Sequence, residues 1–180
     1  MKRTLAALGT FLLVTAALFA QSEFSSPKPA VTVSHIDAPS LQKGKSAPVT
    51  LTFHVSPGFH INSNRPNSEL LIPTTLHLDP PTDLSLGNML YPAGEQLSFP
   101  FAPDEKLSVY SGDFKVTATA RTVGSIRPGT YRVHGELKYQ ACDDHACYPP
   151  KSAQVAFDVH VAPPAKAGHR NPAQSPNVHQ

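Results

Sequence analysis

Two cysteines are the residues of this chain best suited to covalent chemistry. Cys142 and Cys147 are the only cysteines among 180 residues, and four residues separate them. A disulfide between them would close a very short loop. By the loss of entropy in the unfolded chain, such a cross-link stabilises the fold by about 2 kcal/mol, against about 3 kcal/mol for a fifteen-residue loop. A structural cross-link gains more from distant cysteines, so the short spacing favours thiol-disulfide exchange over a purely structural bond.

The residues between the cysteines shape the reactivity expected of the pair. Asp143, Asp144 and His145 are polar turn-forming residues that allow the two sulfurs to meet. The two carboxylates disfavour a thiolate, whereas a protonated His145 favours it. The pair follows a predicted strand, so no helix N-terminus lowers either thiol pKa. We therefore expect a modest nucleophile whose reactivity is supplied by docking with a partner.

Two other interpretations of the cysteine loop remain open at this stage. The first is a structural disulfide in an exported binding or assembly module. The second is a copper or zinc carrier, because Cys142, His145 and Cys147 are soft ligands within one loop. His54 or His60, folded nearby, would complete a plausible ligand set.

Composition narrows the class of protein. The chain has 15 Lys and Arg against 13 Asp and Glu, a net charge of +2, so it offers no basic stripe for nucleic acid. Its nine histidines are scattered, without the HExxH or His-x3-His spacing of a helical metal site. A length of 180 residues suits one domain that can bury its own core.

Both ends of the chain differ from its middle. Residues 1–20 combine Lys2 and Arg3 with an apolar run of about fifteen residues, which is shorter than the roughly 20 residues of a membrane-spanning helix. This pattern predicts a signal peptide cleaved after Ala20 or Ala17. Residues 21–29 are predicted to be a flexible leader and 162–180 a disordered Pro-rich tail. The domain is therefore expected at 30–161, in an exported, disulfide-permissive compartment.

Apolar residues in the middle of the chain recur with a period of two. Val49, Leu51, Phe53 and Val55 alternate with polar residues, the pattern of a strand with one buried face. Many such strands separated by turns predict an all-β fold, an immunoglobulin-like β-sandwich. The predicted strands are 30–35, 49–55, 74–78, 84–86, 107–110, 114–122, 131–139 and 154–161.

The cysteine loop also carries a family resemblance. Tyr139-Gln140-Ala141-Cys142, followed after the spacer by Cys147-Tyr148-Pro149-Pro150, resembles the Y-Q-x-C … C-Y-P-P motif of the N-terminal periplasmic domain of the thiol:disulfide interchange protein DsbD. Residues 55–64 (VSPGFHINSN) are similar to a strand-turn segment of the same family. The resemblance covers most of residues 30–161.

The resemblance implies a function and a set of partners. Cys147 would form the mixed disulfide with a partner and Cys142 would resolve it, with the redox-active disulfide as the only redox group and no other cofactor. The partners would be periplasmic thioredoxin-fold proteins of the disulfide isomerase or cytochrome c maturation type. As an enzyme, the chain would be a protein-disulfide reductase. Tyr139 and Tyr148, which flank the cysteines in the motif, are expected to modulate the pair.

The sequence also departs from the family pattern. The spacer has four residues, where the best-known members have five. His60 and Asn62 stand near the position of family tyrosines, which predicts a more polar cysteine environment. Full-length DsbD continues into a membrane domain and a thioredoxin domain, whereas the resemblance here covers only the N-terminal domain, so a separate membrane electron donor is expected.

Family members cover their cysteines with an aromatic cap loop when no partner is docked. The candidate for this loop is 96–105. Its lid would be Phe99 or Phe101, with Asp104 and Glu105 as acidic residues near the thiols. The alternative is that both phenylalanines are core residues and both acidic residues are ordinary exposed charges.

Overall fold

The alternation of apolar and polar residues appears directly in the burial of the strands. The computed structural model describes residues 29–164, and the predicted signal peptide, the leader up to residue 28 and the tail from residue 165 lie outside this range. In Ser46–Val55 every second residue from Val49 onward is buried, and Asp113–Thr122 and Lys151–Val161 show the same period. Each strand therefore turns one face to a core and one to water.

In residues 29–164, eleven strands form three antiparallel sheets. No helix in this range is long and apolar enough to cross a membrane. The first sheet has the order β1 (Val31–Asp37), β2 (Ser46–Val55), β8 (Asp113–Thr122), β5 (Leu84–Leu90). The second has the order β10 (Ala141–Cys142), β3 (His60–Asn62), β7 (Ala102–Tyr110), β6 (Glu95–Phe99). The third has the order β11 (Lys151–Val161), β9 (Gly129–Tyr139), β4 (Thr75–Asp79).

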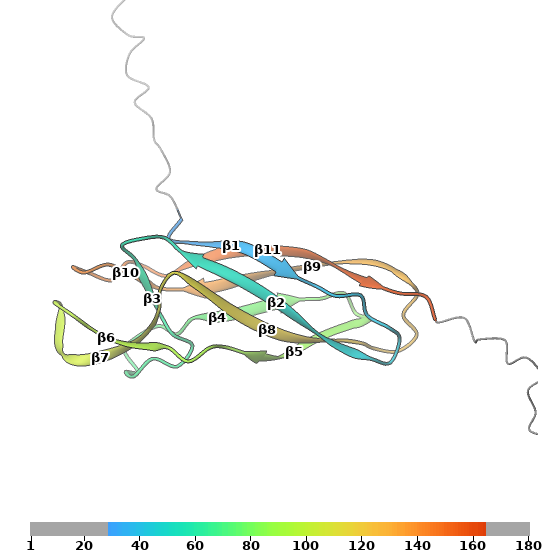
Figure 1. The fold of residues 1–180 in the computed structure, drawn as a ribbon, viewed down its shortest axis with the longest axis horizontal. Coiled ribbons are helices and arrows are strands. Elements are labelled where there is room, and N and C mark those ends of the chain that lie inside the picture. The colour runs from blue at the N-terminus through green and yellow to red at the C-terminus, as the bar shows by residue number, and fades with distance from the viewer. Residues whose placement is uncertain (1–28, 165–180) are drawn as a thin grey trace, which may run out of the picture.

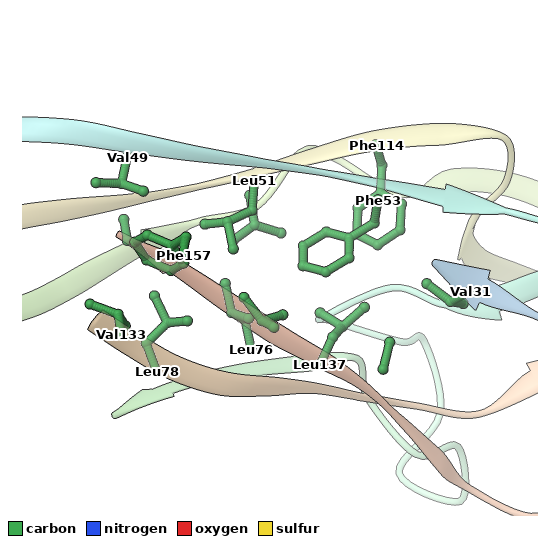
Figure 2. Packing of buried hydrophobic residues seen from close by; sticks show 14 of the residues in the cluster. Val31, Val49, Leu51, Phe53, Leu76, Leu78, Phe114, Val133, Leu137 and Phe157 are labelled. Carbon is green, nitrogen blue, oxygen red and sulfur yellow. The ribbon is translucent and has the colours of Figure 1, made fainter. Parts of the chain in front are cut away.

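The main core lies between the first and third sheets. Leu51 and Phe53 of β2 face Leu137 of β9 and Phe157 of β11 across this space (Figure 2). The rings of Phe53 and Phe114 stack with their centroids 5.4 Å apart. Fully burying each such side chain is worth about 1.5–3 kcal/mol, so this core supplies the rigidity of the domain. The prediction of an immunoglobulin-like β-sandwich is confirmed.

The second sheet is built from short continuations of the other two. After β2, the turn at Gly58, whose φ is +83°, leads into β3, and β9 runs through Gln140 into β10. β7 turns back into β8 at Gly112, whose φ is +57°. As a result, β10, β3, β6 and β7 gather at one end of the elongated sandwich, and the C-terminal end of β11 lies at the opposite end (Figure 1).

Eight predicted strands are present, although most extend further than predicted, and three strands were missed. β3, β6 and β10 have three, five and two residues, too short for a period-two pattern to stand out. The cap segment 96–105 was predicted as a loop, and that prediction is wrong. It is a hairpin of β6 and β7, because Glu95–Phe99 finds backbone partners on β7 although four of its five residues are exposed.

Gly135 marks a close approach between two strands and provides a test of the packing. A Cβ atom there would lie 2.3 Å from the backbone oxygen of His77 on β4. Gly135→Ala is therefore expected to force β4 and β9 apart and to lower the free energy of unfolding by about 1–3 kcal/mol, as measured by denaturant titration. Gly87→Ala is the matched control, since its Cβ would meet nothing within 4 Å. Equal effects of the two substitutions would contradict this account of the packing.

Candidate functional site

The two cysteines form a disulfide across a miniature hairpin at the tip of the second sheet. Their Cα atoms are 3.9 Å apart, and the two residues form an antiparallel bridge. The Asp143 N–H donates to the Ala146 carbonyl at 3.0 Å, and the Tyr148 N–H donates to the Ala141 carbonyl at 2.8 Å. Cys142 is 0% exposed, whereas Cys147 is only half-buried. The pair thus has one sheltered member and one that a partner can approach.

Asp143 organises the turn between the cysteines. Its Oδ1 accepts the N–H groups of His145 at 2.8 Å and Ala146 at 2.9 Å, and its Oδ2 accepts the Tyr148 hydroxyl at 2.5 Å. The Tyr148 hydrogen bond, followed by the two backbone donors, lowers the pKa of the Asp143 carboxyl from 3.8 to about 2. The same hydrogen bond raises the pKa of Tyr148. Asp143 is therefore a fixed carboxylate that shapes the loop.

The other two polar residues of the spacer point into solvent. The side chain of His145 is 90% exposed, and its Nδ1 lies 3.8 Å from Asp143 Oδ1. Asp144 is exposed. Only Asp143 has a defined structural role in the spacer, and the modulating roles predicted for Asp144 and His145 stay predictions.

His60 lies on the strand that pairs with the first cysteine. In the β3–β10 ladder His60 is directly opposite Cys142, and its residue exposure is 4%. Burial lowers the pKa of the His60 imidazole below its ordinary value of 6.5, although the carboxylates of Asp144 and Asp143 act in the opposite direction. The predicted polar neighbour of the cysteines is thus a buried, neutral imidazole at pH 7.

Three aromatic rings are layered beside this pair. The His60 ring stacks on Phe99 with centroids 3.8 Å apart, and Phe99 stacks on Phe101 with centroids 5.5 Å apart. Phe99 is also part of a small buried cluster with Leu107 and Val109, whereas Phe101 is 38% exposed. The tip of the β6–β7 hairpin therefore covers His60, the neighbour of Cys142. Asp104 and Glu105 are exposed on β7.

An apolar pocket is lined in part by residues that flank the two cysteines in the sequence. It has a volume of about 290 Å³ and is lined by Phe59, Tyr139, Tyr148 and Pro149 among others. Phe59 and Tyr148 meet edge to face, with centroids 6.0 Å apart. Tyr139 is buried, and burial raises its pKa. Both motif tyrosines therefore line one surface next to Cys147.

The side-chain contacts of two residues in this site, Phe59 and Gln140, were not predicted from the sequence. Phe59 was quoted only as part of a motif, and nothing local in the sequence announces its contact with Tyr148. Gln140 accepts a hydrogen bond from Asn62 Nδ2 at 3.2 Å, and Asn62 Nδ2 also donates to the Ile72 carbonyl at 3.0 Å. Asn62 is fully buried and ties β3 to the chain between β9 and β10. The only sign of this contact in the sequence was that Gln140 lies within the cysteine motif.

The copper or zinc interpretation receives no support from the side-chain arrangement. Within residues 29–164 no group of three His, Cys, Asp or Glu side chains is placed to hold a metal ion. Cys142 and Cys147 are bonded to each other, and His54 Nδ1 lies 2.6 Å from Asp113 Oδ1. The proposed ligand set is therefore not assembled in the disulfide form.

The tie between Asp143 and Tyr148 predicts a specific titration. Tyr148→Phe removes the largest cause of the lowered pKa, so the Asp143 pKa should rise from about 2 toward 3.8 in a carboxyl NMR titration. Because the folded-state pKa is lowered, the contribution of Asp143 to stability is complete above pH 3.8 and is lost as pH falls through about 2. In the variant the loss should be smaller and should end at a higher pH, because only the folded-state pKa of Asp143 rises.

Tyr131→Phe is the matched control for this titration. It removes a hydroxyl that donates to the Arg127 carbonyl instead of to Asp143. An Asp143 titration that is the same in Tyr148→Phe, Tyr131→Phe and the unmodified protein would contradict the role assigned to the Tyr148 hydroxyl.

Comparison with known proteins places this geometry in a family. The fold is similar to the reduced DsbD N-terminal domain of Neisseria meningitidis, at 20% identity over 62% of this chain and 77% of that chain, with a TM-score of 0.41. It is also similar to the N-terminal periplasmic domain of ScsB from Proteus mirabilis, at 15% identity over 66% of this chain and 43% of that chain, with a TM-score of 0.43.

A third solved structure is the complex between the DsbD N-terminal and PilB N-terminal domains of Neisseria meningitidis, at 18% identity over 76% of this chain and 87% of that chain, with a TM-score of 0.44. No curated protein sequence gives a significant match. The family model described as "Thiol:disulfide interchange protein DsbD, N-terminal" matches residues 22–159, most of the chain. The chain therefore belongs to the family of DsbD N-terminal domains, thiol-disulfide exchange domains with a cysteine pair.

Proposed function

We propose that this protein passes electrons between a reductant and oxidised periplasmic proteins through Cys142 and Cys147. The observation that carries the proposal is the disulfide itself, closed over four residues at an exposed tip with one sulfur-bearing residue buried and the other half-buried. Such an asymmetric pair suits exchange, which needs one approachable sulfur and one that resolves the adduct.

The chemistry of one cycle assigns the two cysteines different roles. The Cys147 thiolate attacks a partner disulfide, and the mixed disulfide forms as the first partner thiolate leaves. The Cys142 thiolate then attacks Cys147 Sγ, the intramolecular disulfide closes, and the second partner thiolate leaves. Two electrons pass to the partner, and the dithiol must be restored by a donor. The greater exposure of Cys147 supports its role as the residue that meets the partner.

The partners follow from the same chemistry. We infer thioredoxin-fold proteins of the disulfide isomerase or cytochrome c maturation type as acceptors, and a separate membrane protein as donor. One similar structure is of a DsbD N-terminal domain in complex with a PilB N-terminal domain. The periplasm is the compartment proposed, in line with the family and with the signal peptide expected at residues 1–20.

A structural disulfide is the second candidate, and one observation favours it. Cys142 is fully buried, and backbone hydrogen bonds close the hairpin on both sides of the bond. In that case the apolar pocket and the aromatic stack would serve stability alone.

Trapping separates the two functions. Cys142→Ala removes the resolving thiol, so a mixed disulfide through Cys147 should accumulate with an oxidised thioredoxin-fold protein and be visible on a non-reducing gel. Cys147→Ala is the matched control and should give little adduct, because its remaining cysteine is buried. Equal trapping by both variants would contradict the assigned roles, and no adduct from either would leave the structural interpretation.

A second experiment tests the cover over the pair. Phe101→Ala weakens the closed hairpin, so a small dithiol should reduce the Cys142–Cys147 disulfide about two- to tenfold faster, since an aromatic pair is worth about 0.5–1.5 kcal/mol. Leu97→Ala is the matched control, because Leu97 lies on the same hairpin and is also 38% exposed, like Phe101. Reduction rates that respond equally to both substitutions would rule out a specific cover.

A further inference from the structure

Two buried side-chain atoms on β3 have no hydrogen-bond partner within the described residues, His60 Nε2 and Asn62 Oδ1, and only His60 lies directly opposite a cysteine. His60 Nε2 is inaccessible to solvent and makes no hydrogen bond within the described part of the chain. A buried polar atom without a partner is destabilising, so its presence calls for a physical reason. The imidazole is stacked on Phe99 and lies on a strand that pairs with β10.

The redox state of the pair supplies that reason. Side chains directly opposite each other in an antiparallel ladder have Cβ atoms about 4.5–5.5 Å apart, which places His60 beside Cys142. A disulfide has no proton to donate, so it offers no donor to Nε2 in the tautomer that leaves this nitrogen unprotonated. Reduction creates an S–H group on Cys142, which gives the residue opposite His60 a donor.

We propose that His60 is the proton acceptor for the Cys142 thiol in the resolving step of disulfide exchange. This rests on the proposed function of the cysteine pair. The Cys142 S–H bond breaks, its proton moves to His60 Nε2, and the sulfur electron pair forms the bond to Cys147 Sγ. The bond between Cys147 and the partner breaks, and the partner leaves as a thiolate. The imidazolium then returns its proton to that thiolate or to water.

The charge around His60 suits this task. Its burial among aromatic rings keeps the imidazole neutral and able to accept a proton at pH 7. The cysteine loop presents two carboxylates that stabilise the imidazolium once it forms. The β6–β7 hairpin faces it with uncharged rings, and its acidic residues are exposed. The groups concerned are Asp143 and Asp144 in the loop, and Phe99, Phe101, Asp104 and Glu105 in the hairpin.

A coloured aromatic disulfide separates the two chemical steps. Added to the reduced protein, it releases one coloured thiolate when Cys147 attacks and a second when Cys142 resolves the adduct. Cys142→Ala should release only the first. In His60→Phe, which keeps a ring for stacking, the second phase should slow at least about tenfold near pH 7, the scale of a lost general base. The rate of this second phase in His60→Phe should rise again as the pH approaches the ordinary thiol pKa of about 8.5, where Cys142 ionises without a base.

The controls distinguish this inference from the function on which it rests. His134→Gln changes an exposed histidine on β9 and should leave both phases unaltered. A second phase in His60→Phe with the rate and pH profile of the unmodified protein would overturn the role of His60. An unmodified protein that releases no coloured thiolate would instead overturn the exchange function.

A measurement on the unmodified protein guards against a variant that fails to fold. The His60 imidazole is followed by NMR across pH in the disulfide and dithiol forms. Its titration should differ between the two forms, because only the dithiol offers a donor to Nε2, and Cys142→Ala, which has no thiol opposite His60, should titrate like the disulfide form. Identical titrations in the disulfide and dithiol forms would overturn the proposal.

Discussion

The site depends on a ladder of two residue pairs. β10 and β3 are joined through Ala141 opposite Ile61 and Cys142 opposite His60. This register places the first cysteine beside a buried imidazole. It also leaves the chain after Cys142 free to turn back, which brings Cys147 into a bridge with Cys142. A shift of one residue would turn every side chain of β10 to the other face, so the chemistry requires this register.

The sandwich makes so short a ladder stable. β10 is the continuation of an eleven-residue strand, β9, which pairs along its whole length with β11, and β3 follows the ten-residue β2. Both short strands therefore inherit their positions from long, well-packed neighbours. The buried Asn62 adds a side-chain link by donating to Gln140 and to the Ile72 carbonyl. Rigid strands on both sides allow a small loop to hold a reactive bond without a large core of its own.

The sequence predicted the long strands and the cysteine chemistry. It did not predict the short strands or the contacts between residues far apart in the chain. β2, β8 and β11 were recognisable because ten or eleven residues give several repeats of a period-two pattern. β6 was not, because its burial pattern is exposed at four of five positions. The stack of His60 on Phe99 joins residues 39 positions apart, and no local pattern reports such a contact. The family motif placed the cysteines, and the sequence named Asp143 and His60 as their polar neighbours. The hydrogen bonds of Asp143 and the position of His60 opposite Cys142 came only from geometry.

The cysteine site combines two charged carboxylates, Asp143 and Asp144, with a buried imidazole and a buried cysteine, His60 and Cys142. Two acidic residues beside a cysteine oppose thiolate formation, yet Asp143 is fully engaged with two backbone N–H groups and the Tyr148 hydroxyl. Its charge is therefore partly satisfied by donors, which weakens its effect on a neighbouring sulfur. The ring of Phe99 packs on His60, which is buried like Cys142, and a low-dielectric environment strengthens a hydrogen bond between such groups. Of the two cysteines only Cys147 reaches the surface, so it is the accessible member of the pair, while Cys142 and His60 lie inside the fold.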